Sequence, residues 1–339
     1  MKAYINKTAI VSPQRTFDQD FPMEVVRYPD AKYLKCIEPL YKDFLDPMVS
    51  RRMSRIVKMG VCAALSCLRK AGVEMPDAVI AGTGLGCLED TEKFLGSIYT
   101  LQEHLLNPTP FINSTHNTIT GAIALAIKCH GYNATFTHRG FSFESALLDA
   151  LMLASENPEA SILAGAFDEI TANSYDITKR LGLWESTIPG EGVAFFMLSG
   201  KRQPNSMAQL TALYTLFNPD RECAVEKEMY NFIKNVGLSV QDIDLVVMGI
   251  NGDLLTDGYY KHLMGGMFEG KPVAEFKHLS GEYDTASSFA LWLASQVIHK
   301  QHVPEWIRAN EFQPDKLKNI LIYNHLRGVN HSFYILSAC

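Results

Sequence analysis

One short stretch of the chain places chemically capable side chains at the start of a helix. Residues 135–137 (Thr-Phe-Thr) suit a half-buried strand, and residues 143–154 predict a buried, largely apolar helix. The turn between them contains Gly140 and Ser142, and Glu144 falls in the first helical turn, where free backbone N–H groups favour oxygen atoms. Several enzyme families present a nucleophile at such a strand–turn–helix junction.

The side chains of this junction also have simpler structural explanations. Ser142 is expected to N-cap the helix. Glu144 is expected to be a helix-capping carboxylate, a buried plug in the site, or an acid or base. His138, beside Arg139 at the end of the strand, is expected on the surface or at a subunit edge.

The composition indicates a well-buried protein. The 339 residues are 47% hydrophobic and only 20% charged, with a net charge of -6, which is enough for one large domain or two closely packed ones. Mild acidity and the lack of a Lys/Arg run argue against a nucleic-acid partner. The sequence contains no apolar run of 18 residues and therefore predicts no membrane span, and the N-terminal segment is too short and too polar for a signal peptide.

The seven cysteines are scattered and odd in number. They form no Cys-x-x-Cys pair and have no histidine at a metal-binding spacing. We therefore expect reduced thiols in a cytoplasmic protein, without a metal or other cofactor.

Strands and helices are expected to alternate along the chain. Strands are expected at 2–12, 78–86, 135–137, 161–166, 193–198, 208–216, 244–249, 273–277, 319–324 and 332–337, and helices at 53–70, 90–105, 117–129, 142–154, 222–236, 257–267 and 284–299. This alternation is typical of α/β proteins with mostly parallel sheets. The polar segment 200–206 is the best internal boundary, and the pattern repeats in outline after it.

Five motifs occur in the same order as in a known family. They are Ser54-Arg55-Ile56, Thr83-Gly84-Leu85-Gly86, Asn117 with Gly121, Pro189-Gly190-Glu191-Gly192-Val193-Ala194, and Gly328-Val329-Asn330. Together they resemble the β-ketoacyl-ACP synthases, over nearly the whole chain. The resemblance implies the thiolase-like α/β fold: two similar halves, 1–200 with its elbow at 138–146 and 201–339, with mixed five-stranded sheets layered between helices.

The family's chemistry uses a cysteine at the elbow, which takes the acyl group, and two loop histidines. By this resemblance the cysteine position holds Glu144 when counted back from the helix, or Gly140 when counted forward from Gly131. No cysteine lies between residues 129 and 223. Ser142 is the hydroxyl that could replace the thiol.

The two histidine loops are also changed. Residues 249–257 align with the family's HGTGTxxND loop, with Gly249 in place of histidine, and residues 277–282 align with KxxxGH, with Lys277 kept and Glu282 in place of histidine. Glycine donates no side-chain hydrogen bond, and a glutamate repels a developing oxyanion. Two carboxylates in one pocket need a cation between them, which predicts a Glu144–Lys277–Glu282 cluster.

The resemblance is strongest to the chain-length-factor subunits and to the compact synthase-like proteins of aryl-polyene and flexirubin clusters. We therefore expect a non-catalytic subunit of fatty-acid or polyketide biosynthesis. It would pair through residues near 134–140 with an active β-ketoacyl-ACP synthase or with a second copy. An active 3-oxoacyl-ACP synthase or acyltransferase with unusual residues, and a scaffold that binds acyl carrier protein, are the alternatives. The carrier's phosphopantetheine arm is the one expected ligand.

Overall fold

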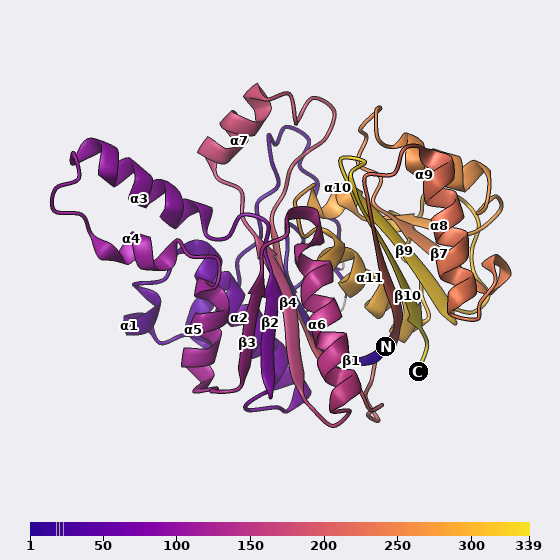
Figure 1. Ribbon diagram of the computed structural model, residues 1–339, viewed down its shortest axis with the longest axis horizontal. Coiled ribbons are helices and arrows are strands. Elements are labelled where there is room, and N and C mark those ends of the chain that lie inside the picture. Colours follow the sequence, from indigo (N-terminus) through magenta and orange to yellow (C-terminus); the bar gives the residue numbers. More distant parts are fainter. Residues whose placement is uncertain (18, 20, 23) are drawn as a thin grey trace.

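A continuous hydrogen-bonded sheet runs through the computed structural model, which describes residues 1–17, 19, 21–22 and 24–339 (Figure 1). Among the described residues it has ten strands in the order β3-β2-β4-β5-β1-β6-β10-β9-β7-β8. The strands are β1 (Ala3–Val11), β2 (Ala78–Gly82), β3 (Tyr132–Phe136), β4 (Ile162–Asp168), β5 (Gly192–Ser199), β6 (Ala208–Phe217), β7 (Leu245–Met248), β8 (Val273–Glu275), β9 (Asn319–Leu326) and β10 (Asn330–Ser337).

The two ends of this sheet have the same topology. Strands β3-β2-β4-β5-β1 correspond in order to β8-β7-β9-β10-β6. In each half three strands are parallel and the remaining two add antiparallel neighbours. The prediction of two similar halves with mixed five-stranded sheets is confirmed. One detail differs, because antiparallel pairing of Ala3–Ile5 with 208–210 joins the halves into one ladder. The domain boundary at residue 200 stays a prediction.

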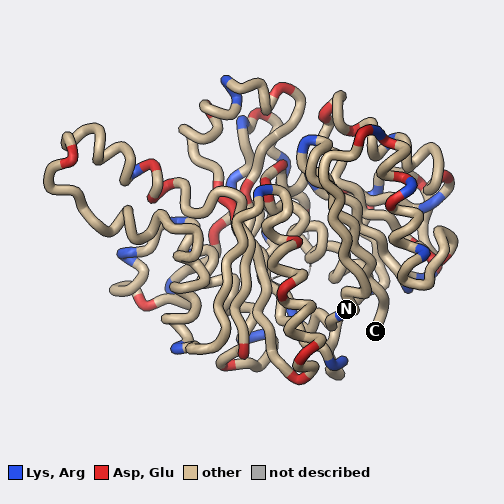
Figure 2. The backbone as a smooth tube through the Cα atoms, viewed as in Figure 1, with Lys and Arg blue, Asp and Glu red and all other residues tan. Residues whose placement is uncertain are grey.

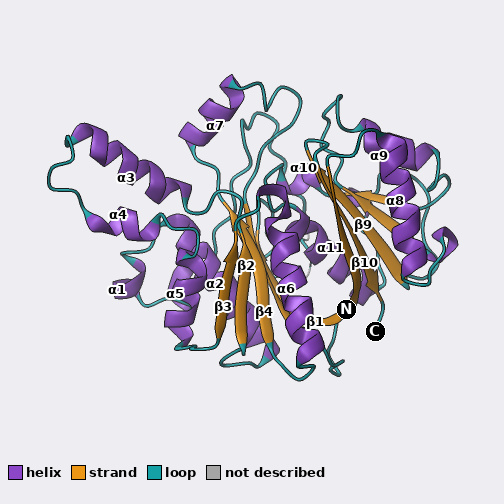
Figure 3. Ribbon diagram, viewed as in Figure 1, coloured by secondary structure: helices purple, strands orange, loops and turns teal. Residues whose placement is uncertain are grey.

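Helices cover both faces of each half-sheet (Figure 3). Helices α6 (Ser142–Glu156) and α11 (Ser287–Lys300) contribute to the central core, α2 (Arg55–Ala71) and α5 (Thr118–Ile127) to the outer core of the first half, and α8 (Glu222–Asn235) and α9 (Gly258–Gly265) to that of the second. The strands have apolar runs because both faces are buried: in β2, Ala78 and Ile80 belong to the central core, Val79 and Ala81 to the outer one.

The predicted strands and long helices all occur, with ends shifted by a few residues. Helix α3 (Leu88–Thr100) corresponds to the helix predicted at 90–105. The short helices α1 (Pro47–Ser50), α4 (Pro108–Asn113), α7 (Ala172–Arg180) and α10 (Lys277–Ser280) were not predicted. None of the described helices combines the length and the apolar character needed to cross a membrane.

Helix α5 forms where a helix over residues 117–129 was predicted, but it is only partly buried. Leu125 of α5 is 82% exposed, and on α6 Leu148 and Met152 are also exposed. The reason is topological: β3 is an edge of the sheet and pairs only with β2, and α5 and α6 both contact β3. Apolar side chains on this side therefore have no described neighbour to cover them.

A buried carboxylate fixes the turn that precedes β5. Glu191 accepts hydrogen bonds from the backbone N–H groups of Cys36 (2.8 Å) and Ile170 (3.1 Å). It also forms ion pairs with Arg55 (2.7 Å) and Lys35 (3.3 Å). Three distant segments are thus held together beside the turn of Pro189 and Gly190, which lines the cavity described in the next subsection.

Replacing Glu191 by alanine is expected to destabilise the protein by about 3–5 kcal/mol, because two buried N–H groups lose their acceptor and Arg55 loses one of its two carboxylate partners. Urea unfolding followed by circular dichroism measures the difference. The control is Glu159→Ala, which breaks an exposed pair with Lys201 and should leave the midpoint unchanged. Equal midpoints for all three proteins would contradict the anchoring role of Glu191.

Candidate functional site

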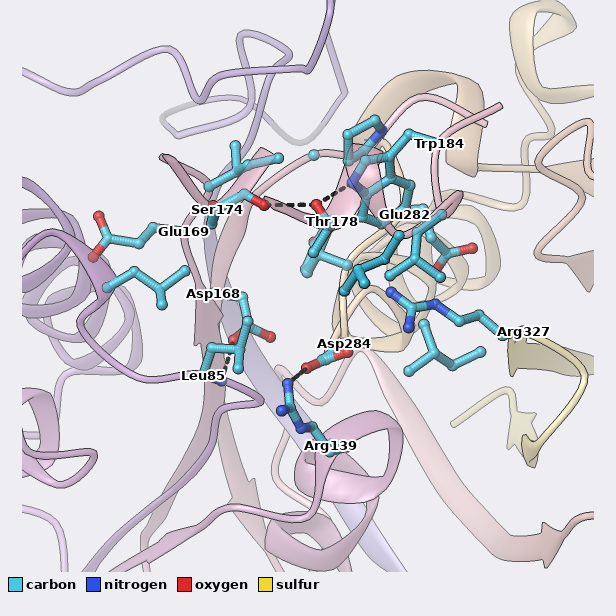
Figure 4. A pocket seen from close by; sticks show the side chains of 18 of the residues that line it. Leu85, Arg139, Asp168, Glu169, Ser174, Thr178, Trp184, Glu282, Asp284 and Arg327 are labelled. Atoms are coloured by element: carbon cyan, nitrogen blue, oxygen red, sulfur yellow. Dashed lines mark hydrogen bonds and ion pairs between the residues drawn. The ribbon is translucent and has the colours of Figure 1, made fainter. Parts of the chain in front are cut away.

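A cavity of about 510 Å³ lies where loops of the two halves meet (Figure 4). Its walls come from the ends of β4 and β9, the turn before β5, the segment around α7 and the loop between α10 and α11. Most of the lining is apolar, with charged side chains in one region. The lining residues include Leu85, Leu88, Arg139, Asp168, Glu169, Leu181, Leu183, Trp184, Glu282, Asp284, Leu326, Arg327, Val329 and Asn330.

The elbow between β3 and α6 differs from its prediction. Helix α6 begins at Ser142, its N-cap residue is Phe141, and no side chain caps it. The Ser142 hydroxyl is buried and accepts a hydrogen bond from the His138 backbone N–H at 2.7 Å. N-capping by Ser142 was therefore wrong, because the hydroxyl turns back to close the elbow. His138 is exposed, and its Nδ1 lies 3.3 Å from the Ser145 hydroxyl.

The elbow residue whose side chain lines the cavity is Arg139. Its backbone φ is 51°, a left-handed value that non-glycine residues rarely adopt. One guanidinium nitrogen lies 3.6 Å from the Asp284 carboxylate. Gly140 is buried, and a Cβ there would come within 2.9 Å of Leu326. The cavity lining includes neither Gly140 nor Glu144.

Glu144 lies in the first turn of α6, and its side chain is buried. Its Oε1 accepts a hydrogen bond from the Tyr334 hydroxyl at 2.6 Å, and its Oε2 has no hydrogen-bond partner. Burial raises the pKa of Glu144, and hydrogen bonding from Tyr334 offsets this only in part. The burial of Glu144 excludes the expected exposed helix cap, and because Glu144 does not line the cavity, a plug in the site stays a prediction.

Lys277 and Glu282 form a buried ion pair at one side of the cavity. The Lys277 ammonium lies 2.7 Å from Glu282 Oε2 and donates to the His325 carbonyl at 2.9 Å. The Asn251 amide donates to the same Glu282 oxygen at 2.5 Å. Glu282 Oε1 has no hydrogen-bond partner. Burial raises the pKa of Glu282, and Lys277 opposes that shift.

The predicted three-residue cluster is only partly present. The structure brings Lys277 and Glu282 together, but the hydrogen bond of Glu144 goes to Tyr334. The reason is that Glu144, in the first turn of α6, has its side chain on the buried face of the helix, where it meets Tyr334 of β10. A second cavity of about 740 Å³ is lined by Lys277 and Asn251, so the ion pair lies between two hollow regions.

Gly249 has no room for a side chain. A Cβ there would lie 2.4 Å from Asn324 Oδ1, 2.7 Å from the Tyr260 hydroxyl and 2.9 Å from the Lys277 stem. The space that a larger residue would need is thus occupied by its neighbours.

Two other histidines are buried close to this region but engaged elsewhere. His325 Nε2 lies 3.1 Å from the Thr256 carbonyl, and His331 Nδ1 lies 2.9 Å from the Tyr323 hydroxyl. Burial lowers the pKa of both, that of His331 to about 4, so both are neutral at pH 7. Among the described residues, no group of His, Cys, Asp and Glu could hold a metal ion.

Sequence reasoning missed four lining residues: Arg139, Trp184, Asp284 and Arg327. Two of them stand inside or beside motifs that were already singled out, the elbow and Gly328-Val329-Asn330. The signal that could have identified Arg139 is its position, because a long side chain in a strand–turn–helix junction can extend over the N-terminus of the helix.

Comparison with known proteins identifies a family over more than half of the chain. The family model for the N-terminal domain of beta-ketoacyl synthases matches residues 31–221. No curated protein sequence matches the chain.

Three solved structures share the fold at low sequence identity. The ishigamide ketosynthase/chain length factor is 14% identical with a TM-score of 0.79, over 100% of this chain and 99% of that one. The ketosynthase ApeO in complex with its chain length factor ApeC from Xenorhabdus doucetiae is 15% identical with a TM-score of 0.77, over 99% of this chain and 98% of that one. A ketosynthase complex with a type II polyketide acyl-carrier protein, AntDE:AntF, is 12% identical with a TM-score of 0.76, over 100% of this chain and 99% of that one.

Replacing Glu144 by glutamine is expected to change how stability depends on pH. Because its pKa is raised in the folded state, the unfolded chain loses this proton first as pH rises. Wild-type stability therefore declines relative to Glu144→Gln above the ordinary glutamate pKa, by about 1.4 kcal/mol for each pH step of one until the folded-state pKa is reached. Chemical unfolding of both proteins from pH 4 to 8 measures this difference.

Glu38→Gln is the control, because its stability difference from wild type should change with pH in the opposite direction. Burial alone would raise the pKa of Glu38, but hydrogen bonds from Tyr41 and Arg55 outweigh it and lower the pKa. Wild type should therefore gain stability over Glu38→Gln as pH rises. A Glu144→Gln difference that is flat, or that follows the Glu38 direction, would contradict an unpaired buried carboxyl.

Cysteine substitution tests which elbow residue reaches the cavity. In a Cys223→Ser/Cys339→Ser background, which removes the two exposed thiols, Arg139→Cys should react with iodoacetamide at least about tenfold faster than Glu144→Cys, because only an accessible thiolate reacts. Intact mass against time gives the rates, and circular dichroism checks folding. Faster labelling at residue 144 would place Glu144, not Arg139, at the cavity.

Proposed function

Because the chain belongs to the beta-ketoacyl synthase family, shown by the match over residues 31–221, we propose that it is a non-catalytic subunit of the chain-length-factor type. In this proposal it pairs with an active β-ketoacyl-ACP synthase in fatty-acid or polyketide biosynthesis. Its own cavity does not carry out condensation.

The observation that carries the proposal is the chemistry of the cavity lining. Among its described residues there is no cysteine and no histidine. Arg139 lies at the elbow, where the family presents its nucleophile, and Gly249 and Glu282 occupy the two positions aligned with histidines. These positions in this chain are inferred from the alignment of motifs.

These substitutions remove the expected driving forces of the reaction. Each oxyanion donor is worth about 10²–10³ in rate, and Gly249 supplies none. Glu282 adds negative charge, which the Lys277 ammonium offsets and the Asn251 amide stabilises by a hydrogen bond. The hydroxyl of Ser142 is buried and accepts the His138 N–H, which disfavours the alternative of a serine-dependent acyltransferase.

An apolar surface beside the elbow supports pairing with another subunit. Strand β3 and helix α5 contain no charged residue (Figure 2), and β3 is an open edge with unpaired backbone groups. Tyr132, Leu125, Leu148 and Met152 are exposed around it at 48%, 82%, 44% and 46%. Exposed apolar side chains on the helices that flank an open sheet edge are typical of an interface.

Co-expression with candidate synthases tests the proposal. A tagged chain is expected to co-purify with an intact Cys-His-His synthase, and the pair should make longer products from malonyl-ACP than the synthase alone. The isolated chain should show no condensation. Condensation by the isolated chain at ordinary synthase rates would overturn the proposal, and so would the lack of any effect on every partner.

The acyl-carrier-protein scaffold is the second outcome of this test. One of the similar structures is a ketosynthase in complex with its acyl-carrier protein, so the carrier and its phosphopantetheine arm are the partners to include. Binding of acyl-ACP without any synthase partner would favour the scaffold over the paired subunit.

The double substitution Leu125→Glu/Met152→Glu is expected to disrupt pairing, because it places charges on both sides of the β3 edge. Size-exclusion chromatography with light scattering should show the complex separate into single subunits, with at least about a tenfold weaker association.

Tyr230→Glu is the matched control. Tyr230 lies on α8 in the other half and is similarly exposed, at 53%. A complex that survives Leu125→Glu/Met152→Glu but separates with Tyr230→Glu would locate the interface on the second half of the chain and contradict pairing through the β3 edge.

A further inference from the structure

Two arginines give the 510 Å³ cavity an unusual charge arrangement. Arg139 from the elbow and Arg327 from the loop after β9 both line it, and Asp284 lies between them in Figure 4. Arg327 stacks over the Trp184 ring at 5.6 Å, and the Trp184 indole donates to Thr178 at 2.5 Å. A tryptophan fixed by a hydrogen bond thus holds one of the two guanidinium groups in place.

The Arg139–Asp284 contact is loose. Its 3.6 Å separation exceeds the roughly 2.7–2.9 Å of a strong charge-assisted hydrogen bond. Asp284 Oδ2 has no hydrogen-bond partner. An incoming carboxylate could make closer, bidentate contacts with a guanidinium than Asp284 does.

The other acids of the lining have partners. Asp168 accepts five hydrogen bonds, from Thr83, Thr285 and backbone N–H groups, and Glu282 is paired with Lys277. Glu169 accepts the Glu89 N–H.

Burial reduces the negative charge that these acids carry at neutral pH. Burial raises the pKa of Asp168 and Glu169 to about 7, and burial also raises that of Asp284. Both arginines stay charged. A single negative charge can therefore approach the two guanidinium groups, whereas a phosphate monoester of about −1.5 to −2 charge meets more repulsion from the carboxylates that remain ionised.

Apolar side chains make up much of the rest of the cavity lining. They are Leu85, Leu88, Leu181, Leu183, Leu326 and Val329. A volume of about 510 Å³ falls in the usual range of about 300–1,000 Å³ for small-molecule sites.

We propose that this cavity binds a medium-chain aliphatic carboxylate, with its anionic group on Arg139 and Arg327 and its chain against the leucine walls. This binding goes beyond the pairing role: a chain that pairs with no synthase would still bind the acid.

The experiment uses decanoate with the full-length protein, and decanamide as its neutral isostere. Calorimetric titration should give one decanoate per chain and at least tenfold weaker binding of decanamide. Arg139→Gln and Arg327→Gln should each weaken decanoate binding at least tenfold without changing the decanamide affinity. The surface variant Arg51→Gln should behave as wild type.

Asp284→Asn tests whether weaker decanoate binding in the arginine variants reflects loss of folding. It removes the competing carboxylate and should strengthen decanoate binding severalfold, a gain that a misfolded protein cannot give. Equal affinity for acid and amide, unchanged binding in both arginine variants, or displacement of decanoate by equimolar inorganic phosphate would each overturn the proposal. Pairing with a synthase should survive Arg139→Gln, and decanoate binding should survive Leu125→Glu/Met152→Glu, which separates this inference from the proposed function.

Discussion

The buried Lys277–Glu282 ion pair is the interaction on which the site depends. The Glu282 backbone is part of the contact between the halves, because its N–H donates to the Ile188 carbonyl and its carbonyl accepts the Gly190 N–H. The Glu282 carboxylate also binds the Lys277 ammonium and the Asn251 amide. Loss of either charged partner would leave an uncompensated charge in the interior. One residue thus joins the two halves and sets the charge of the cavity wall.

Around this pair the cavity is organised by electrostatics rather than by nucleophilic groups. The wall carboxylates Asp168, Glu169 and Glu282 are engaged by backbone N–H groups, hydroxyls or Lys277. Among the described residues, the Asp284 carboxylate forms an ion pair only with Arg139, at 3.6 Å. Arg139 and Arg327 are the long cations that remain near solvent. Such an arrangement can bind and orient a molecule, but among its described lining residues it offers no thiol or imidazole for acyl transfer.

Much of the fold followed from local patterns, whereas the site followed only in part. The central strands β2, β4 and β5 were predictable because each is an apolar run that is buried on both faces, and the repeated strand order follows from duplicated alternation. The N-cap at Ser142 failed because capping depends on the conformation of Phe141 and on where the hydroxyl turns. Counting along the chain could not reveal that Arg139 takes a left-handed φ, or that Glu144 meets Tyr334, 190 positions away. Exposure of α5 depends on the sheet edge, which no local pattern encodes.

The packing around Gly249 has an evolutionary consequence. A histidine introduced there would collide with Asn324 and the Tyr260 hydroxyl, whose atoms lie 2.4 and 2.7 Å from the new Cβ. Any residue with a side chain at position 249 therefore requires Asn324, Tyr260 or Lys277 to move. Substitutions at Gly249 and at these three neighbours are thus expected to occur together rather than singly.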